Sequence, residues 1–240
     1  VAIMSSMFQG CSGLTSLDLS SFDTSSVVSM GGMFWVCSGL TSIDVSSFDT
    51  SSVTNMSLMF RQCSGLTSLD LSTFDTSSVT TMSSMFQSCN GSTGIDVSNF
   101  DTSSVLNMDG MFLFCTGLTS LDVSSFDTSS ATTMSSMFRQ CSSLTSLDVS
   151  TFVTTSALLT TSSMFRSCTA LTSVDVSSLD TSGVNNMSNM FVDCNALTSI
   201  VGVEDFIITG LDQIGDLNAF LTQGRMTTAQ YDALLVNWEA

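Results

Sequence analysis

Eight cysteines are the first residues of this chain whose type and spacing suggest chemistry. They recur at a constant spacing, with one longer interval between the sixth and the seventh, and they stand at Cys11, Cys37, Cys63, Cys89, Cys115, Cys141, Cys168 and Cys194. Aligned thiols of this kind form either disulfides or a buried row of free thiols, and no Cys-x-x-Cys pair is present to favour zinc. Each thiol has an equivalent neighbour on both sides, so pairing would draw alternate repeats together unequally. We therefore expect a buried ladder of free thiols.

Aspartates form two further columns with the same spacing. The first column lies in the middle of predicted strands: Asp18, Asp44, Asp70, Asp96, Asp122, Asp148 and Asp175. Hydrogen bonds from Ser and Thr hydroxyls on the same and the next strand would offset the repulsion within it, and Ca²⁺ bound between its carboxylates is the alternative. The second column is expected to cap helix N-termini: Asp23, Asp49, Asp75, Asp101, Asp127 and Asp180.

One column varies strongly from repeat to repeat, namely the two residues between Phe and Cys. It holds Trp35, Arg61, Leu113, Phe114, Arg139 and Arg166. Trp and Arg are enriched in binding hot spots, so the column predicts a ligand-binding ridge for a cell-surface glycan or protein. A tolerant, exposed helix end would explain the same variation without a ligand. The threonine row of the strand face would suit ice binding, but the interleaved carboxylates disfavour that function.

Charge and composition exclude several classes of function. The chain has four basic and 21 acidic residues, a formal net charge of −17 and no His. Four arginines cannot neutralise a run of phosphates, so nucleic acid is excluded as a partner. His is absent as a base or metal ligand and Lys as a Schiff base, and the acidic residues recur in every repeat instead of marking one pocket. We expect a protein that is not an enzyme and has no cofactor and no metal site. No stretch approaches the roughly 18 to 20 apolar residues of a membrane span.

The elements that position these columns follow from one repeat. Residues 14–20 alternate apolar and polar side chains, which predicts a short strand. Val27, Met30, Met33 and Phe34 then fall on one face of a predicted short helix. Self-similarity at a fixed period of this length indicates a solenoid. The predicted fold is an α/β solenoid, a leucine-rich-repeat-like arc of about nine coils, each with one parallel strand and one helix.

The ends and two repeats depart from this regularity. Residues 1–200 are predicted to form the solenoid, and 201–240 a degenerate last repeat with a helical C-terminal cap. Val1 falls inside a helical half-repeat, so we expect the chain to be part of a longer chain or assembly. Ser92 and Gly94 replace the usual Leu and Ser, and Val153 begins a segment with a single insertion. These two coils should be the least regular.

The unit L-T-S-L-D-[LV]-S-x-F-D-T-S-S-V-x-x-M-x-x-M-F-x-x-C resembles the 26-residue repeat of bacterial surface proteins of the BspA-like leucine-rich-repeat family, over roughly residues 1–200. It is also similar to repeat modules of phage tail-fibre proteins. The resemblance implies an extracellular setting, on a bacterial cell surface or a phage virion. It implies a non-enzymatic recognition or adhesion module, with a rigid structural spacer in a surface filament or viral fibre as the alternative.

Overall fold

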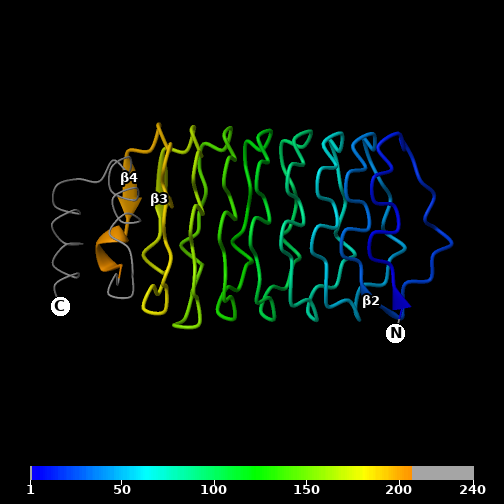
Figure 1. The fold of residues 1–240 in the computed structure, drawn as a ribbon, viewed down its shortest axis with the longest axis horizontal. Coiled ribbons are helices and arrows are strands. Elements are labelled where there is room, and N and C mark those ends of the chain that lie inside the picture. Colours follow the sequence, from blue (N-terminus) through cyan, green and yellow to red (C-terminus); the bar gives the residue numbers. More distant parts are fainter. Residues whose placement is uncertain (1, 207–240) are drawn as a thin grey trace.

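The 26-residue repeat is one coil of a solenoid. The computed structural model describes residues 2–206, and their coils follow one another along a single long axis (Figure 1). The regular elements are β1 (Ala2–Ile3), β2 (Val27–Ser29), β3 (Ser173–Asp175), β4 (Ser199–Val201) and a 3₁₀ helix, η1 (Val203–Asp205). β1 pairs with β2 and β3 with β4, both in parallel. The predicted repeat solenoid is confirmed.

Backbone hydrogen bonds join neighbouring coils on one side of the solenoid. This side, called the turn side below, is equivalent to residues 27–40 of the second coil. Met30 N–H donates to the Asn55 carbonyl (3.0 Å) in the next coil, and Phe34 N–H to the Met59 carbonyl (2.9 Å). The intervening Met33 N–H donates to the Met30 carbonyl of its own coil (3.1 Å). Single parallel bridges continue along this side at Ser29, Asn55, Thr81, Asn107, Thr133, Thr160 and Asn186. Alternate backbone donors therefore close turns and join coils.

The prediction of one helix per coil is wrong for the described residues. Apolar residues at Val27, Met30 and Met33 fit a period of three as well as one of 3.6, and so short a segment does not separate the two. Starting a helix is costly, and here half of the donors bond the next coil instead. The turns need left-handed residues, and each described coil has two, as at Gly32 (φ 64°) and Val36 (φ 63°) in the second coil.

The side equivalent to 41–52 of the second coil, called the aspartate side below, has few backbone links. Regular strands form at the predicted place only in β3 and β4, in the last described coils. Elsewhere an isolated bond such as Thr67 N–H to the Thr41 carbonyl (3.1 Å) joins neighbouring coils. A local bond follows the strand position: Ser46 N–H donates to the carboxylate of Asp44 (3.0 Å), and Ser177 N–H donates to Asp175 in the same way directly after β3. The predicted strand of each coil is thus realised in part.

Buried threonines supply a link that the sequence did not suggest. Thr50 is 1% exposed; its hydroxyl donates to the Asp75 carbonyl of the next coil (2.9 Å) and accepts from Asp75 N–H (2.8 Å). Equivalent donations to the next coil come from Thr24, Thr76, Thr102, Thr128 and Thr154. One hydroxyl per coil therefore links these coils, and at Thr24 and Thr50 it both donates to and accepts from the backbone of the next coil.

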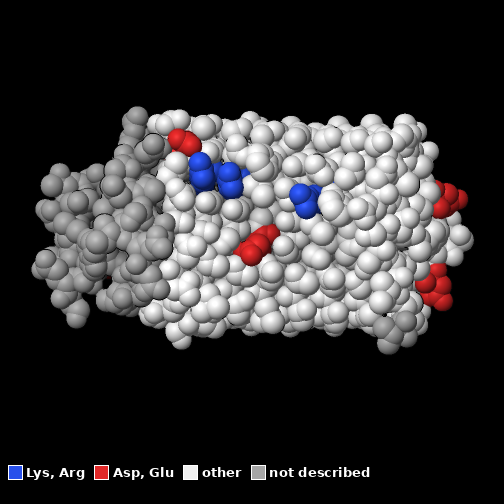
Figure 2. All heavy atoms as spheres, viewed as in Figure 1, with Lys and Arg blue, Asp and Glu red and all other residues white. Residues whose placement is uncertain are grey.

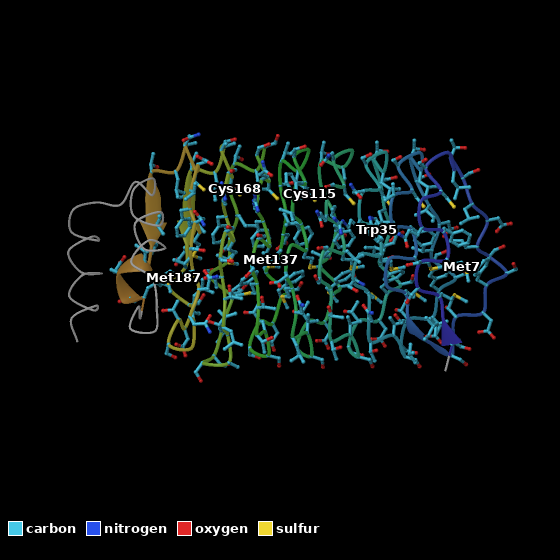
Figure 3. The ribbon with its side chains drawn as sticks, in the orientation of Figure 1. Met7, Trp35, Cys115, Met137, Cys168 and Met187 are labelled. Carbon is cyan, nitrogen blue, oxygen red and sulfur yellow. The ribbon has the colours of Figure 1, made fainter. Side chains whose placement is uncertain are left out.

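The core consists of rows that run along the axis. Phenylalanine rings from successive coils stack with centroids 5.4 to 6.0 Å apart, and the row is Phe8, Phe34, Phe60, Phe86, Phe112, Phe138, Phe165 and Phe191. Cysteines and methionines of successive coils also follow the axis, as Cys115 and Cys168 do in Figure 3. The apolar positions of the repeat are thus the core positions of the coil.

The structure tests the predicted arc but not the predicted C-terminal cap. Curvature was expected because helices need more room than strands; the described coils have no helical layer, and they form a nearly straight row in the view of Figure 1. The predicted C-terminal helix lies outside the described residues.

Both predicted irregular coils depart from the common hydrogen-bonding pattern. The Ser92 hydroxyl bonds the Gly94 carbonyl, and a small hollow between Leu66, Phe86 and Ile95 lies where other coils place a leucine. Val153, which replaces an aspartate, is 57% exposed and donates its N–H to the Thr151 carbonyl (2.8 Å). Replacement of one residue of the repeat pattern therefore changes the structure only locally.

Candidate binding ridge

The variable residues between Phe and Cys form a row on the turn side, called the variable ridge below. The Arg61 guanidinium lies over the Trp35 ring of the preceding coil, 5.0 Å from its centroid. Trp35 Nε1 donates to Gln62 Oε1 (3.0 Å), which fixes the ring. Arg139 lies over the Phe114 ring in the same way, at 5.9 Å. The structure thus brings four of the six predicted site residues together as two arginine–aromatic pairs.

The remaining two predicted site residues lie beside these pairs. Leu113 precedes Phe114 in the chain, and the Arg166 carbonyl accepts the backbone N–H of Gln140 (2.8 Å), one coil before it. All six side chains are half-buried, not fully exposed as the helix-end interpretation would require. The guanidiniums of Arg61 and Arg139 lie over aromatic rings of the preceding coil, which contributes to the burial of these two pairs.

Several polar atoms of the variable ridge have no partner. The Nε atoms of Arg61 and Arg139 are buried without a hydrogen bond, and so is Oε1 of Gln140. A buried polar atom without a partner costs free energy. The sequence could identify these residues as variable, but not that they lack partners.

Charge is distributed unevenly over the surface. Figure 2 shows the three arginines of the described chain in a row across a face that is otherwise almost free of charge. Acidic groups also appear on this face, beside the arginine row, and at the end of the stack nearest the N-terminus. Asp193 belongs to the variable ridge, and its Oδ2 accepts from the Ser167 hydroxyl (3.4 Å). The aspartate columns thus lie largely away from the guanidiniums, and a positive strip stands on a strongly acidic protein.

The first aspartate column is stabilised within each coil. Asp44 Oδ1 accepts from the N–H (3.0 Å) and the hydroxyl (2.6 Å) of Ser46. These bonds hold the pKa of Asp44 below its ordinary value, against the opposing effect of Asp70 and Asp18 in the neighbouring coils. In all seven members a serine N–H two residues further on donates to the carboxylate. Hydrogen bonding as the offset is confirmed, with the donors in the same coil rather than the next.

The second column makes the same local turn. Asp49 Oδ1 accepts from Ser51 N–H (3.1 Å) and from its hydroxyl (2.6 Å), which lowers the pKa of Asp49. No helix follows these aspartates in the described coils, so the helix-capping prediction is wrong and the carboxylates close turns instead.

An open hollow of about 660 Å³ lies on the aspartate side. Its lining includes Asp44, Asp70, Asp96, Ser46 and Ser72 from three successive coils. Within the described residues, no three carboxylate or thiol side chains are grouped so that they could hold a metal ion. The repeat pattern alone does not indicate this hollow.

The thiol ladder is present as predicted. All eight cysteines are free, and seven of them are buried. Cys63 Sγ–H donates to the Phe34 carbonyl of the preceding coil (3.0 Å), and burial raises the pKa of Cys63 to about 12. Cys11, in the first described coil, is exposed. Seven thiols therefore act as small core residues, not as nucleophiles.

The coils, the phenylalanine row and the regular period define a repeat solenoid. The family model described as "Mycoplasma protein of unknown function, DUF285" matches residues 2–94 and 89–203, so this chain belongs to the DUF285 family. No match is found among curated proteins.

Three solved structures show a weak likeness. They are a leucine-rich-repeat protein of T. pallidum (18% identity, TM-score 0.42, covering 78% of this chain and 68% of that one), a leucine-rich cell surface protein of Faecalibacterium prausnitzii (17%, 0.36, 96% and 71%) and a leucine-rich-repeat protein of Bacteroides ovatus (16%, 0.32, 82% and 67%). At such low TM-scores, no property of the three proteins carries over to this chain.

Proposed function

We propose that this protein is a non-enzymatic, extracellular recognition or adhesion module that binds a cell-surface glycan or protein through the variable ridge. The observation that carries the proposal is the pairing of Arg61 with Trp35 and of Arg139 with Phe114. Aromatic and arginine side chains are the commonest binding hot spots, and these are the residues that differ from coil to coil. A discriminating contact needs such differences.

The proposed setting is the bacterial cell surface, with a phage virion as the other setting that the repeat resemblance implies. The structure contributes one finding about membranes: the described residues include no helix that is both long and apolar enough to cross a bilayer.

The absence of enzymatic activity remains part of the proposal. The aspartates repeat in the same local turn in successive coils, and seven of the eight thiols are buried in the core. A catalytic site needs a unique constellation of groups, and these columns are periodic.

Cell attachment by a ridge variant tests the proposed function. The variant combines Trp35→Ser, Arg61→Ser and Arg139→Ser, and fluorescently labelled protein is measured on candidate host cells. Its control combines Thr41→Ser, Thr67→Ser and Thr93→Ser on the exposed aspartate side. Because the ridge residues are half-buried, the melting temperature of each variant is measured first. We expect the ridge variant to stay folded and lose attachment, and the control to attach like the parent.

A rigid spacer is the second candidate function. The uninterrupted phenylalanine row and the hydrogen bonds from coil to coil favour it, because both resist bending of the stack. Equal attachment by the ridge variant and the parent would contradict binding through the ridge and support the spacer.

A further inference from the structure

The aromatic rings of the variable ridge are already engaged by arginines. Arg61 covers one face of Trp35, and Trp35 Nε1 is bonded to Gln62. Arg139 covers Phe114. A ring face that carries a guanidinium is not free to stack on a sugar ring. The groups that remain for a ligand are therefore the guanidinium N–H donors, which the rings hold in place.

These donors recur at a defined spacing. Arg61 and Arg139 belong to two copies of the sequence Met-Phe-Arg-Gln-Cys, three coils apart, and Arg166 occupies the same column one coil further on. At about 4.8 Å per coil, Arg61 and Arg139 are about 14 Å apart along the axis, and Arg166 about 5 Å beyond. The guanidiniums are thus arranged along the solenoid axis as two groups. Arg61 stands alone in the first group, and Arg139 and Arg166 form the second.

Each group is prepared for an anion. A guanidinium offers a planar fork of donors that matches a carboxylate, and packing on a ring reduces the freedom lost on binding. The overall charge of −17 repels polyanions, so any such binding depends on these local contacts.

The surroundings of the arginines favour a glycan over an acidic protein. The neighbouring columns of the turn side carry hydroxyls and amides, as at Asn55, Ser57, Thr81 and Ser83. The large apolar side chains that are exposed in the described chain are outside the variable ridge, although Leu106 and Leu159 stand in a column of the turn side: Ile3, Met7, Leu106, Val153, Leu159 and Val201. Protein interfaces are usually anchored by buried apolar or aromatic groups, whereas sugars need hydroxyl and amide partners.

We infer that the variable ridge binds an anionic glycan chain whose carboxylates are held by Arg61 and by the Arg139–Arg166 pair, with the chain running along the solenoid axis. This inference rests on the proposed function, since it uses the same ridge. It differs from it in naming the ligand class and in assigning the aromatic rings to position arginines, not to stack on sugars.

Binding to defined polymers tests this inference. The probes are immobilised polysialic acid, hyaluronan and alginate, each beside its carboxyl-reduced form, and affinity is measured by biolayer interferometry at several salt concentrations. We expect at least one carboxylated polymer to bind, its reduced form not to bind, and affinity to fall as salt rises. Binding to none of the three would overturn the inference.

Two triple variants with equal net charge separate local contacts from general electrostatics. The first carries Arg61→Gln, Arg139→Gln and Arg166→Gln. The second carries Ser52→Asp, Ser78→Asp and Ser104→Asp, at exposed serines outside the ridge. Each makes the net charge of the parent more negative by three. We expect the first to lose about tenfold in affinity or more per arginine and the second to change little. Equal losses in both would contradict site-specific binding.

The outcome also separates this inference from the proposed function. If the parent protein binds none of the carboxylated polymers but its attachment to cells is lost in the ridge variant, the anionic-glycan inference is wrong and the proposed recognition function is supported. If attachment does not depend on the ridge, both fail. Arg61→Lys provides a further readout, because it keeps the charge but loses the fork; unchanged affinity would contradict carboxylate recognition by a held guanidinium.

Discussion

The turn side and the aspartate side of the same coil hold the stack together by different means. On the turn side, backbone donors such as Met30 N–H and Phe34 N–H bond the next coil. On the aspartate side, Ser46 N–H is taken by Asp44 of its own coil, and the buried hydroxyl of Thr50 bonds the next coil instead. Where the backbone joins the coils, the outward side chains are free to differ from coil to coil. Where side chains join the coils, the same side chain must recur in each coil. This explains why the variable ridge lies on the turn side.

The largest effect is expected from removing one hydroxyl of the threonine ladder. Thr50→Val keeps the shape but leaves the Asp75 N–H and carbonyl without their partner. Buried unpaired groups cost about 1 to 3 kcal/mol each, so we expect a loss of about 3 kcal/mol in the free energy of unfolding. Thr41→Val, at an exposed threonine of the same side, should change it by less than about 0.5 kcal/mol. Urea denaturation measures both, and similar small losses would show that the ladder is not what joins this side.

Restoring the missing leucine of the fourth repeat should strengthen the stack. Ser92→Leu fills the hollow between Leu66, Phe86 and Ile95 with the side chain that other coils have there. Burying a leucine contributes about 1.5 to 3 kcal/mol, and we expect a gain of about 1 kcal/mol after local repacking. Ser64→Leu, at an exposed position, is the control and should not stabilise the protein. A lower melting temperature for Ser92→Leu would mean that this coil has closed around the serine.

Left-handed positions test the turn side. Val36 is β-branched and has φ 63°, a conformation that costs about 1 kcal/mol or more for such residues. Val36→Asn should raise the free energy of unfolding by about 0.5 to 1 kcal/mol, because Asn tolerates this region. Val28→Asn, in the extended strand β2, should lower it. If both variants are destabilised, a helix-like backbone would fit the turn side better than successive turns.

Acid should weaken the aspartate side first. The serine hydrogen bonds lower the pKa of Asp44, Asp18 and Asp96 from the ordinary value of 3.8. Stability from these bonds is present above that value and is lost as pH falls through the lowered pKa of the folded state. Ser46→Ala should move the pKa of Asp44 upward in a carboxyl carbon NMR titration, while Ser42→Ala, at an exposed serine, should leave it unchanged. If the pKa of Asp44 is unchanged in Ser46→Ala, the Ser46 hydroxyl contributes little to lowering that pKa.

The sequence by itself determined the period and the contents of the core. Phe, Met and Cys recur at the same places in every repeat, and because stacked coils bury equivalent positions, the phenylalanine row and the thiol ladder follow from that spacing. It also indicated the hydrogen-bonded aspartates and the two irregular coils, since each rests on the residue types at hand.

Only the tertiary structure decided how the backbone connects these positions. A period of three and one of 3.6 coincide over a segment as short as 27–34, and the choice of turns over a helix depends on acceptors in the next coil, such as the Asn55 carbonyl. The packing of Arg61 on Trp35 likewise joins residues a whole repeat apart in the chain. Such contacts depend on the register between coils, which arises only when the solenoid is folded.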